Sequence, residues 1–227
     1  YALPLLGWIG IICGLIAWAN ASTAIVLLST CMLLLFIGRV PVKYLFLLML
    51  IGMFLGGVAL FKGERWKTFM KRIESSRIED PDKLPFQLQQ SYMAIATGGI
   101  TGKGPGKSDQ RNSLPHPYSD FIYAIIIEEY GLIGGVMVLF LFLVLLYRGM
   151  VTVARSERAF GGLLSAGLSF ALVVQAFVNM GVAVGLGPIT GLPLPLVSMG
   201  GTSLLFTGIS LGIILSVSKG EVEEENA

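Results

Sequence analysis

Three carboxylates lie close together where a polar loop changes into an apolar segment. Asp120 stands at the junction, and Glu128 and Glu129 follow inside the apolar residues 121–147. An ionisable group within an apolar segment is costly, so it is a functional-site candidate by default. A carboxylate at the boundary between water and membrane could act as a general base, whereas one at depth could bind a cation or pair with another helix.

Each carboxylate also has a purely structural interpretation. Asp120, together with Pro117 and Ser119, resembles the N-cap of the helix that follows. In a regular helix, Glu128 and Glu129 would lie roughly 12–13 Å beyond Asp120 and point about 80° and 180° away from it. The two glutamates therefore cannot both share the face of Asp120, and a structural role for them stays as open as a functional one.

The composition is that of a membrane protein. Of the 227 residues 54% are hydrophobic and only 13% are charged, and the mean hydropathy is +0.78. A soluble domain carries roughly 25% charged residues, so we interpret the chain as an integral membrane protein. The net charge of +2 is too small to indicate a nucleic-acid partner. Cys13 and Cys31 lie in apolar segments without disulfide or metal spacing, which favours two inert buried thiols.

The apolar segments predict an all-α, polytopic membrane protein. A spanning helix needs about 20 mostly apolar residues, and six candidates are present. They are residues 2–19, 23–37, 42–61, 121–147, 161–185 and 202–217. The predicted organisation is three transmembrane helices in 1–61, a large loop over 62–120, three helices in 121–218 and a charged tail over 219–227.

Lysine and arginine in the short connections predict the orientation. The connections 38–43 and 148–160 are basic, whereas 20–22 and 186–201 carry no charge. Basic short loops face the cytoplasm, so the large loop 62–120 is expected outside and both ends of this chain inside.

The large loop carries cations in two patterns. Residues 64–77 have the period of a basic amphipathic helix at the membrane interface, although packing on the protein's own outer surface is an equal alternative. A segment reading GKGPGKS resembles a phosphate loop, but Thr101 stands where the Walker pattern needs Gly and no strand precedes it, so we reject ATP binding. Lys103 and Lys107 are candidates for contacts with an anionic lipid headgroup, against the alternative of solvated charges in a mobile loop.

The connection 186–201 combines Gly and Pro in apolar sequence. Non-helical backbone at membrane level is tolerated where it is buried in protein or lines a cavity. This favours a re-entrant segment that forms a cavity wall, and an ordinary tight connection is the alternative.

Two long motifs resemble one known family. The stretches GKGPGKSDQRNSLPHPYSDFIYAIIIEEYGLIG and QAFVNMGVAVGLGPITGLPLPLVSMGGTSLL are similar to the SEDS family of membrane glycosyltransferases, which comprises FtsW, RodA and SpoVE. The resemblance covers nearly the whole chain. The family fold has about ten spanning helices, and the six segments here look like the last of them. Together with the missing initial Met, this leads us to expect the C-terminal part of a longer protein.

The resemblance implies a reaction and a set of site residues. SEDS proteins polymerise lipid II, the undecaprenyl-diphosphate-linked disaccharide-pentapeptide, at the outer face of the bacterial cytoplasmic membrane. The family's essential acid falls on Asp120 in PHPYSDFIY, which is therefore the expected catalytic base. The expected substrate-binding residues are Arg72, Lys103, Lys107, Arg111, Glu128, Glu129, Ser198 and Gly200.

The resemblance also implies partners. These are a class B penicillin-binding protein, which cross-links the strands, and divisome membrane proteins at the division septum. His116 is the only histidine, so no protein metal cage is predicted. A divalent ion, Mg²⁺ or Mn²⁺, held by Asp120 and the substrate diphosphate is left open.

The chain departs from the family pattern in three motifs. Asn20 in WANASTA replaces an Asp, Met199 in SMGGTS replaces a Tyr, and His116 and Tyr118 change the PEAHTD motif to PHPYSD. These departures concern substrate contacts rather than the reaction class. The overall pattern is closer to the FtsW branch than to the RodA branch.

Two other function classes fit some of the same residues. A lipid transporter or flippase would use intramembrane carboxylates and broken helices, but it needs its key acid near the membrane midplane. A scaffold that only recruits partners would tolerate the loss of Asp120. The predicted place of Asp120 at the water boundary favours the transferase.

Overall fold

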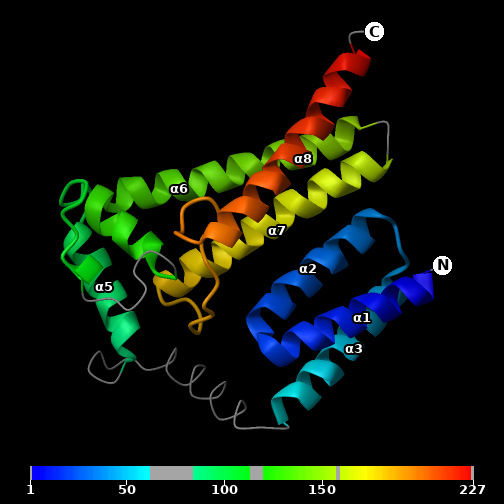
Figure 1. The fold of residues 1–227 in the computed structure, drawn as a ribbon, viewed down its shortest axis with the longest axis horizontal. Coiled ribbons are helices and arrows are strands. Elements are labelled where there is room, and N and C mark those ends of the chain that lie inside the picture. Colours follow the sequence, from blue (N-terminus) through cyan, green and yellow to red (C-terminus); the bar gives the residue numbers. More distant parts are fainter. Residues whose placement is uncertain (1, 62–83, 113–119, 157–158, 226–227) are drawn as a thin grey trace. The chain divides into compact units, whose positions relative to one another are not determined.

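A computed structural model describes residues 2–61, 84–112, 120–156 and 159–225, which form helices and connecting loops without a β-strand (Figure 1). The helices are α1 Ala2–Ala19, α2 Ala21–Ile37, α3 Val42–Phe61, α5 Phe86–Gly98, the short 3-10 helix η2 Gln110–Asn112, α6 Ile122–Arg155, α7 Ala159–Ala183 and α8 Gly201–Glu225. The all-α prediction is therefore confirmed.

The helices have the lengths and composition of a polytopic membrane protein. Three of them are long and apolar enough to cross a membrane, namely Ile122–Arg155, Ala159–Ala183 and Gly201–Lys219. The first three predicted spans are also apolar helices, namely α1, α2 and α3, of 18, 17 and 20 residues. At the other end of the chain, α8 continues to Glu225, so that residues 219–225 extend a helix instead of forming a separate tail.

The described chain divides into two compact units, which we describe separately. The first comprises Tyr1–Phe69, Arg148–Ala171 and Gly212–Ala227. In it, α1 packs against both α2 and α3 around four buried leucines, Leu6, Leu35, Leu45 and Leu48. Asn20, one of the departures from the family pattern, is the N-cap of α2: its Oδ1 accepts a hydrogen bond from the amide of Ser22 at 3.0 Å.

The second unit comprises Met70–Tyr147 and Leu172–Leu211. Its core joins α5, α6 and α7 through buried side chains such as Ala94, Ile127 and Val173. Every described residue that the sequence predicts for the site lies in this unit. Arg72, His116 and Tyr118 lie outside the described residues.

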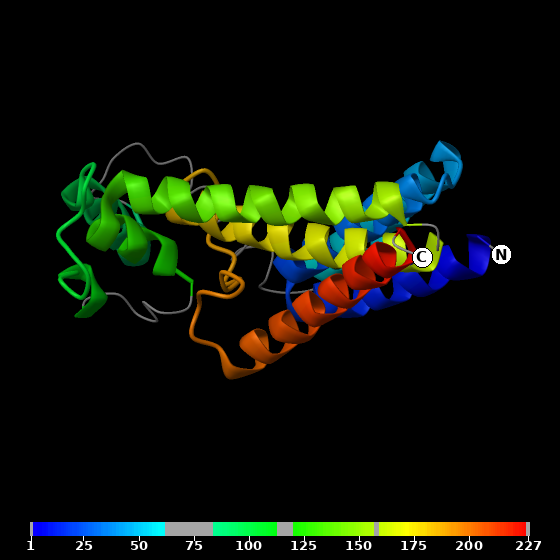
Figure 2. The same ribbon diagram turned by 90° about the horizontal axis from the view of Figure 1, so that it is seen from above.

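The prediction of an unbroken helix over 121–147 is wrong at one residue. Gly131 has φ 70° and ψ −172°, which interrupts α6. We call residues 122–130 the short segment of α6 and residues 132–155 the long segment. Figures 1 and 2 show the two segments as rods that meet at an angle. A residue on the short segment therefore does not lie along the axis of the long, membrane-crossing one.

Candidate functional site

Asp120 lies at the start of the short segment, beside the loop 184–200. Its side chain is half-buried, and its backbone carbonyl accepts a hydrogen bond from Asn179 Nδ2 on α7 at 2.9 Å. A Cβ built on Gly191 would lie 3.8 Å from Asp120 Oδ2, so the backbone of the loop runs next to the carboxylate. Phe121 and Ile125, just after Asp120, pack with Val182 in a small apolar cluster. A carboxylate in such a place can take a proton from a hydroxyl group that reaches its exposed side.

Asn179 joins Asp120 to the loop. The side chain is only 1% exposed, and its Nδ2 also donates to the carbonyl of Leu192 at 2.7 Å. Both neighbours are carbonyl oxygens, which only accept, so the amide nitrogen must be the atom that faces them. Among the described residues, Asn179 Oδ1 is buried without a hydrogen-bond partner. A buried polar atom left unsatisfied costs about 1–3 kcal/mol, so the two hydrogen bonds from Nδ2 hold the side chain in place at the expense of its oxygen.

The loop 184–200 is non-helical backbone that is buried only at its centre, around residues 192–195 and at Ser198, whereas residues such as Leu186 and Met199 are exposed. Leu194 and Pro195 are fully buried, and Gln175 Nε2, one turn before Asn179 on α7, donates to the carbonyl of Pro193 at 2.9 Å. Ser198 is 2% exposed, and its Oγ accepts from the amide of Leu194 at 2.7 Å. The hydroxyl of Ser198 thus holds the turn of the loop. Its role in substrate binding, like the re-entry of this loop into the membrane, stays a prediction.

Glu128, near the other end of the short segment, holds residues 99–112, which we call the Gly-rich loop. Its side chain is fully buried. Lys103 Nζ lies 2.7 Å from Oε1, the amide of Asp109 donates to Oε1 at 3.2 Å, and the hydroxyl of Ser108 donates to Oε2. Residues 99–112 of the large loop are therefore fastened to the short segment through one carboxylate.

These contacts correct the prediction for Lys103. Its amine is held between Glu128 and Asp109, 2.8 Å from Asp109 Oδ2, and is not a mobile cation over a headgroup. Hydrogen bonds to Asp109 and to Glu128 raise the pKa of the Lys103 amine, so this lysine is charged at physiological pH. The carboxylate of Glu128 is not isolated in the apolar segment, because its partners come from the large loop.

Backbone hydrogen bonds complete the junction between the loop and α6. The amides of Lys103 and Gly104 donate to the carbonyls of Glu128 and Glu129, at 3.0 and 2.9 Å. On the far side of the break, the amide of Leu132 donates to the carbonyl of Gly99 at 2.9 Å. The break at Gly131 frees helical donors and acceptors, and the loop satisfies them.

Substitution of Gly102 tests this close docking. Gly102 has φ +77°, and a Cβ there would lie 2.2 Å from the carbonyl oxygen of Glu129. We expect Gly102→Ala to cost about 1–2 kcal/mol for the left-handed backbone and about 1–3 kcal/mol more for the collision. Gly106→Ala is the matched control, because Gly106 has φ +72° and a Cβ there meets nothing within 4 Å. Thermal unfolding in detergent should place Gly102→Ala clearly below the control; equal melting temperatures would contradict the docking.

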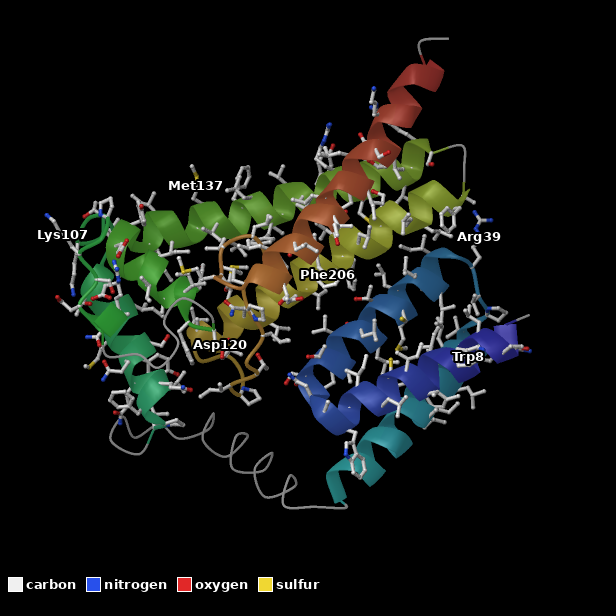
Figure 3. All side chains as sticks on the ribbon, in the orientation of Figure 1. Trp8, Arg39, Lys107, Asp120, Met137 and Phe206 are labelled. Carbon is white, nitrogen blue, oxygen red and sulfur yellow. The ribbon has the colours of Figure 1, made fainter. Side chains whose placement is uncertain are left out.

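The remaining predicted residues do not converge on Asp120. Lys107 is exposed, and Figure 3 shows it and Asp120 at opposite ends of the short segment. Arg111 is exposed on η2, Glu129 is half-buried, and Gly200 is half-buried just before α8. The predicted single site is thus two clusters, an Asp120 cluster with Asn179 and loop 184–200, and a Glu128 cluster with Lys103, Ser108 and Asp109.

Asn179 is absent from the sequence-based site. The available signal is a pair of amide side chains, Gln175 and Asn179, spaced four residues apart in the apolar stretch 170–183. That spacing places both on one face, and polar side chains inside an apolar span call for a partner.

The chain is similar in sequence to one family of known proteins. Residues 1–223 match the family model FTSW_RODA_SPOVE, described as cell cycle protein. The chain is 38% identical over 203 residues to stage V sporulation protein E of Bacillus subtilis, covering 88% of this chain and 55% of that protein. It is 39% identical to the probable peptidoglycan glycosyltransferase FtsW of Alkalilimnicola ehrlichii, covering 89% of this chain and 51% of that protein. It is 37% identical to the peptidoglycan glycosyltransferase MrdB of Escherichia coli, covering 74% of this chain and 48% of that protein.

A solved structure shares the fold. It is described as "Structural coordination of polymerization and crosslinking by a peptidoglycan synthase complex", with a TM-score of 0.66 and 26% sequence identity. The match covers 87% of this chain and 55% of that chain. The chain therefore spans about half the length of the relatives it matches, and the resemblance seen in its motifs is confirmed.

Proposed function

The chain belongs to the FtsW/RodA/SpoVE family of cell cycle proteins, and from this premise we propose that the protein is a peptidoglycan glycosyltransferase that polymerises lipid II. Asp120 is the general base of the proposed reaction. The relatives named peptidoglycan glycosyltransferase support the reaction class, and the place of Asp120 in the structure supports its role.

The observation that carries the proposal is where Asp120 is held. Its carbonyl is fixed to Asn179, which lies four residues before the end of α7. At 1.5 Å per residue, Asp120 is thus level with a point roughly 6 Å from the end of an apolar helix. A half-buried carboxylate near the end of a spanning helix suits a substrate whose lipid stays in the bilayer and whose sugars lie in water.

The proposed chemistry follows from this placement. Asp120 takes the proton of an acceptor sugar hydroxyl while that oxygen attacks C1 of the donor sugar. The bond from C1 to the diphosphate oxygen breaks, and the diphosphate leaves with the electron pair. Cations near the leaving group would stabilise its developing charge. Lys107 and Arg111 are exposed cations of the large loop, but Lys107 lies at the far end of the short segment from Asp120, so we assign them to substrate contacts away from the leaving group.

A divalent cation is part of the same proposal. Magnesium is commonly bound by one or two carboxylates together with substrate phosphates. The half-buried carboxylate of Asp120 fits that donor set, and Mg²⁺ or Mn²⁺ held there would neutralise charge on the diphosphate.

The partner and the place of action extend the proposal. The related structure is described as a complex that polymerises and cross-links, which supports a class B penicillin-binding protein as the partner here. Relatives named FtsW support a role with divisome proteins at the septum of the bacterial cytoplasmic membrane.

One assay separates this function from the alternatives. The full-length protein with its transpeptidase, reconstituted in vesicles with lipid II, should produce glycan strands visible on a gel. Movement of lipid II between leaflets without polymer would instead favour a flippase. Neither polymer nor movement, with partner binding intact, would favour a scaffold.

The proposed outer location of the large loop has its own test. Lys107 is exposed in that loop and Lys43 is exposed at the start of α3, in the connection predicted to be cytoplasmic. In a variant without Cys13 and Cys31, we expect Lys107→Cys to react with a membrane-impermeant maleimide added to intact spheroplasts. Lys43→Cys should react only after lysis, and the opposite pattern would overturn the orientation.

A further inference from the structure

We infer that Asn179 is a positioning residue for catalysis, which acts on the reacting groups through Asp120; this rests on the proposed role of Asp120 as the base. The inference starts from one amide group with two partners. Asn179 Nδ2 lies 2.9 Å from the carbonyl oxygen of Asp120 and 2.7 Å from that of Leu192. An asparagine amide has two N–H donors, and both are used here.

The two partners belong to segments far apart in the sequence. Asp120 precedes the short segment of α6, and Leu192 lies in the loop after α7. The residue before Leu192, Gly191, is the one whose backbone lies beside Asp120 Oδ2. The amide therefore fixes both the residue that bears the base and the wall next to its carboxylate.

The two hydrogen bonds from Asn179 are buried. Asn179 is 1% exposed, and Phe121, directly after Asp120, is 1% exposed. Water has little access to replace the amide as a donor to these carbonyls. Loss of the amide should then let the Asp120 backbone shift, and a displacement of about 1 Å at a reacting group can lower turnover about 10²-fold.

Gln175 supplies a matched control on the same face of α7. It is also an amide, one turn away, and its Nε2 donates to the carbonyl of Pro193 in the same loop. Its hydrogen bond fastens the loop but does not involve Asp120. Asn179→Leu and Gln175→Met each replace an amide by an apolar side chain of similar size, so they separate a loose loop from a misplaced base.

We would measure glycan synthesis per folded molecule with radiolabelled lipid II and the full-length protein bound to its transpeptidase. We expect Asn179→Leu to lower kcat about 10- to 100-fold with KM changed less than about 3-fold. Gln175→Met should stay within about 3-fold of wild type in both constants. An equal loss for the two variants, or a loss confined to KM, would overturn the inference.

The double variant tests whether Asn179 acts through Asp120. If it does, Asp120→Asn with Asn179→Leu should be no slower than Asp120→Asn alone, because the base that Asn179 positions is already absent. If the kcat loss of the double variant equals the product of the two single losses, Asn179 acts independently of Asp120, and the inference is overturned. If Asn179→Leu does not fold, Asn179→Ala takes its place, since it removes both N–H donors without adding volume at the site; wild-type kcat for Asn179→Ala would be decisive against the inference.

Failure of the inference is distinguishable from failure of the proposed function. Near wild-type synthesis by Asp120→Asn would remove the premise itself. A large loss for Asp120→Asn with wild-type kcat for Asn179→Leu would leave the base in place and remove only the role of Asn179.

Discussion

Replacement of Asp120 by Asn should lower glycan synthesis per folded molecule by about 10²–10⁴-fold, the usual contribution of a positioned general base. Asparagine keeps the size and a hydrogen-bonding group, and the backbone carbonyl that Asn179 holds is unchanged. The protein should therefore remain folded and bound to its partner while the proton acceptor is lost. Asp120→Glu should also be slow, because it moves the carboxylate by roughly one methylene.

A helix cap predicts a different outcome for the same variant. Asp120 precedes the first residue of α6 by two positions. Loss of a cap costs about 0.5–2 kcal/mol of stability and leaves the turnover of each folded molecule intact. Synthesis near the wild-type rate, with a lowered melting temperature, would reduce Asp120 to a cap and remove the proposed mechanism.

Replacement of Glu128 by Gln should release the Gly-rich loop. Glu128 is fully buried and accepts from Lys103, Ser108 and the backbone amide of Asp109. Removing its charge weakens several charge-assisted hydrogen bonds and leaves Lys103 with only one carboxylate, at a cost of at least about 2 kcal/mol. We expect the amides of residues 103–110 to exchange with deuterium at least about 30-fold faster than in the wild type.

Asp109→Asn is the control for the loss of one charge in the same cluster. The Asp109 side chain is 78% exposed and contacts the same lysine amine. An exposed ion pair contributes little, so exchange over residues 103–110 should change less than about 5-fold. Equal effects of the two variants, or no effect of Glu128→Gln, would show that the buried carboxylate does not hold the loop.

The sequence was sufficient for the positions of the helices, because apolar length and turn residues are local signals. The prediction of α1 and α3 matches their bounds. The break at Gly131 escaped prediction, because a glycine inside an apolar run is also tolerated in an intact helix. What opens the helix there is a set of partners in the loop some thirty residues earlier, and hydropathy carries no information about them.

The sequence predicts only part of the site, because contacts between distant segments leave no local signal. Asp120 was identified from its position and from the family motif, and the structure adds Asn179, whose two acceptors come from segments distant in sequence. Lys103 illustrates the opposite error. A cation in a Gly-rich loop resembles a mobile ligand group, but its carboxylate partner in α6 is visible only once the chain has folded.

The interruption at Gly131 separates two tasks that a continuous helix would have to combine. Residues 132–155 alone extend roughly 36 Å at 1.5 Å per residue, which exceeds the roughly 30 Å hydrocarbon core of a bilayer. The short segment is thus not needed to cross the bilayer. It sets the distance between two anchored points, Asn179 at one end and the Gly-rich loop at the other. One residue inserted into the short segment would shift Asp120 by about 1.5 Å relative to Glu128 and rotate it by about 100° about the helix axis. Insertions at the exposed tip of the loop around Gly106 should therefore be tolerated, whereas an insertion between Asp120 and Glu128 should not.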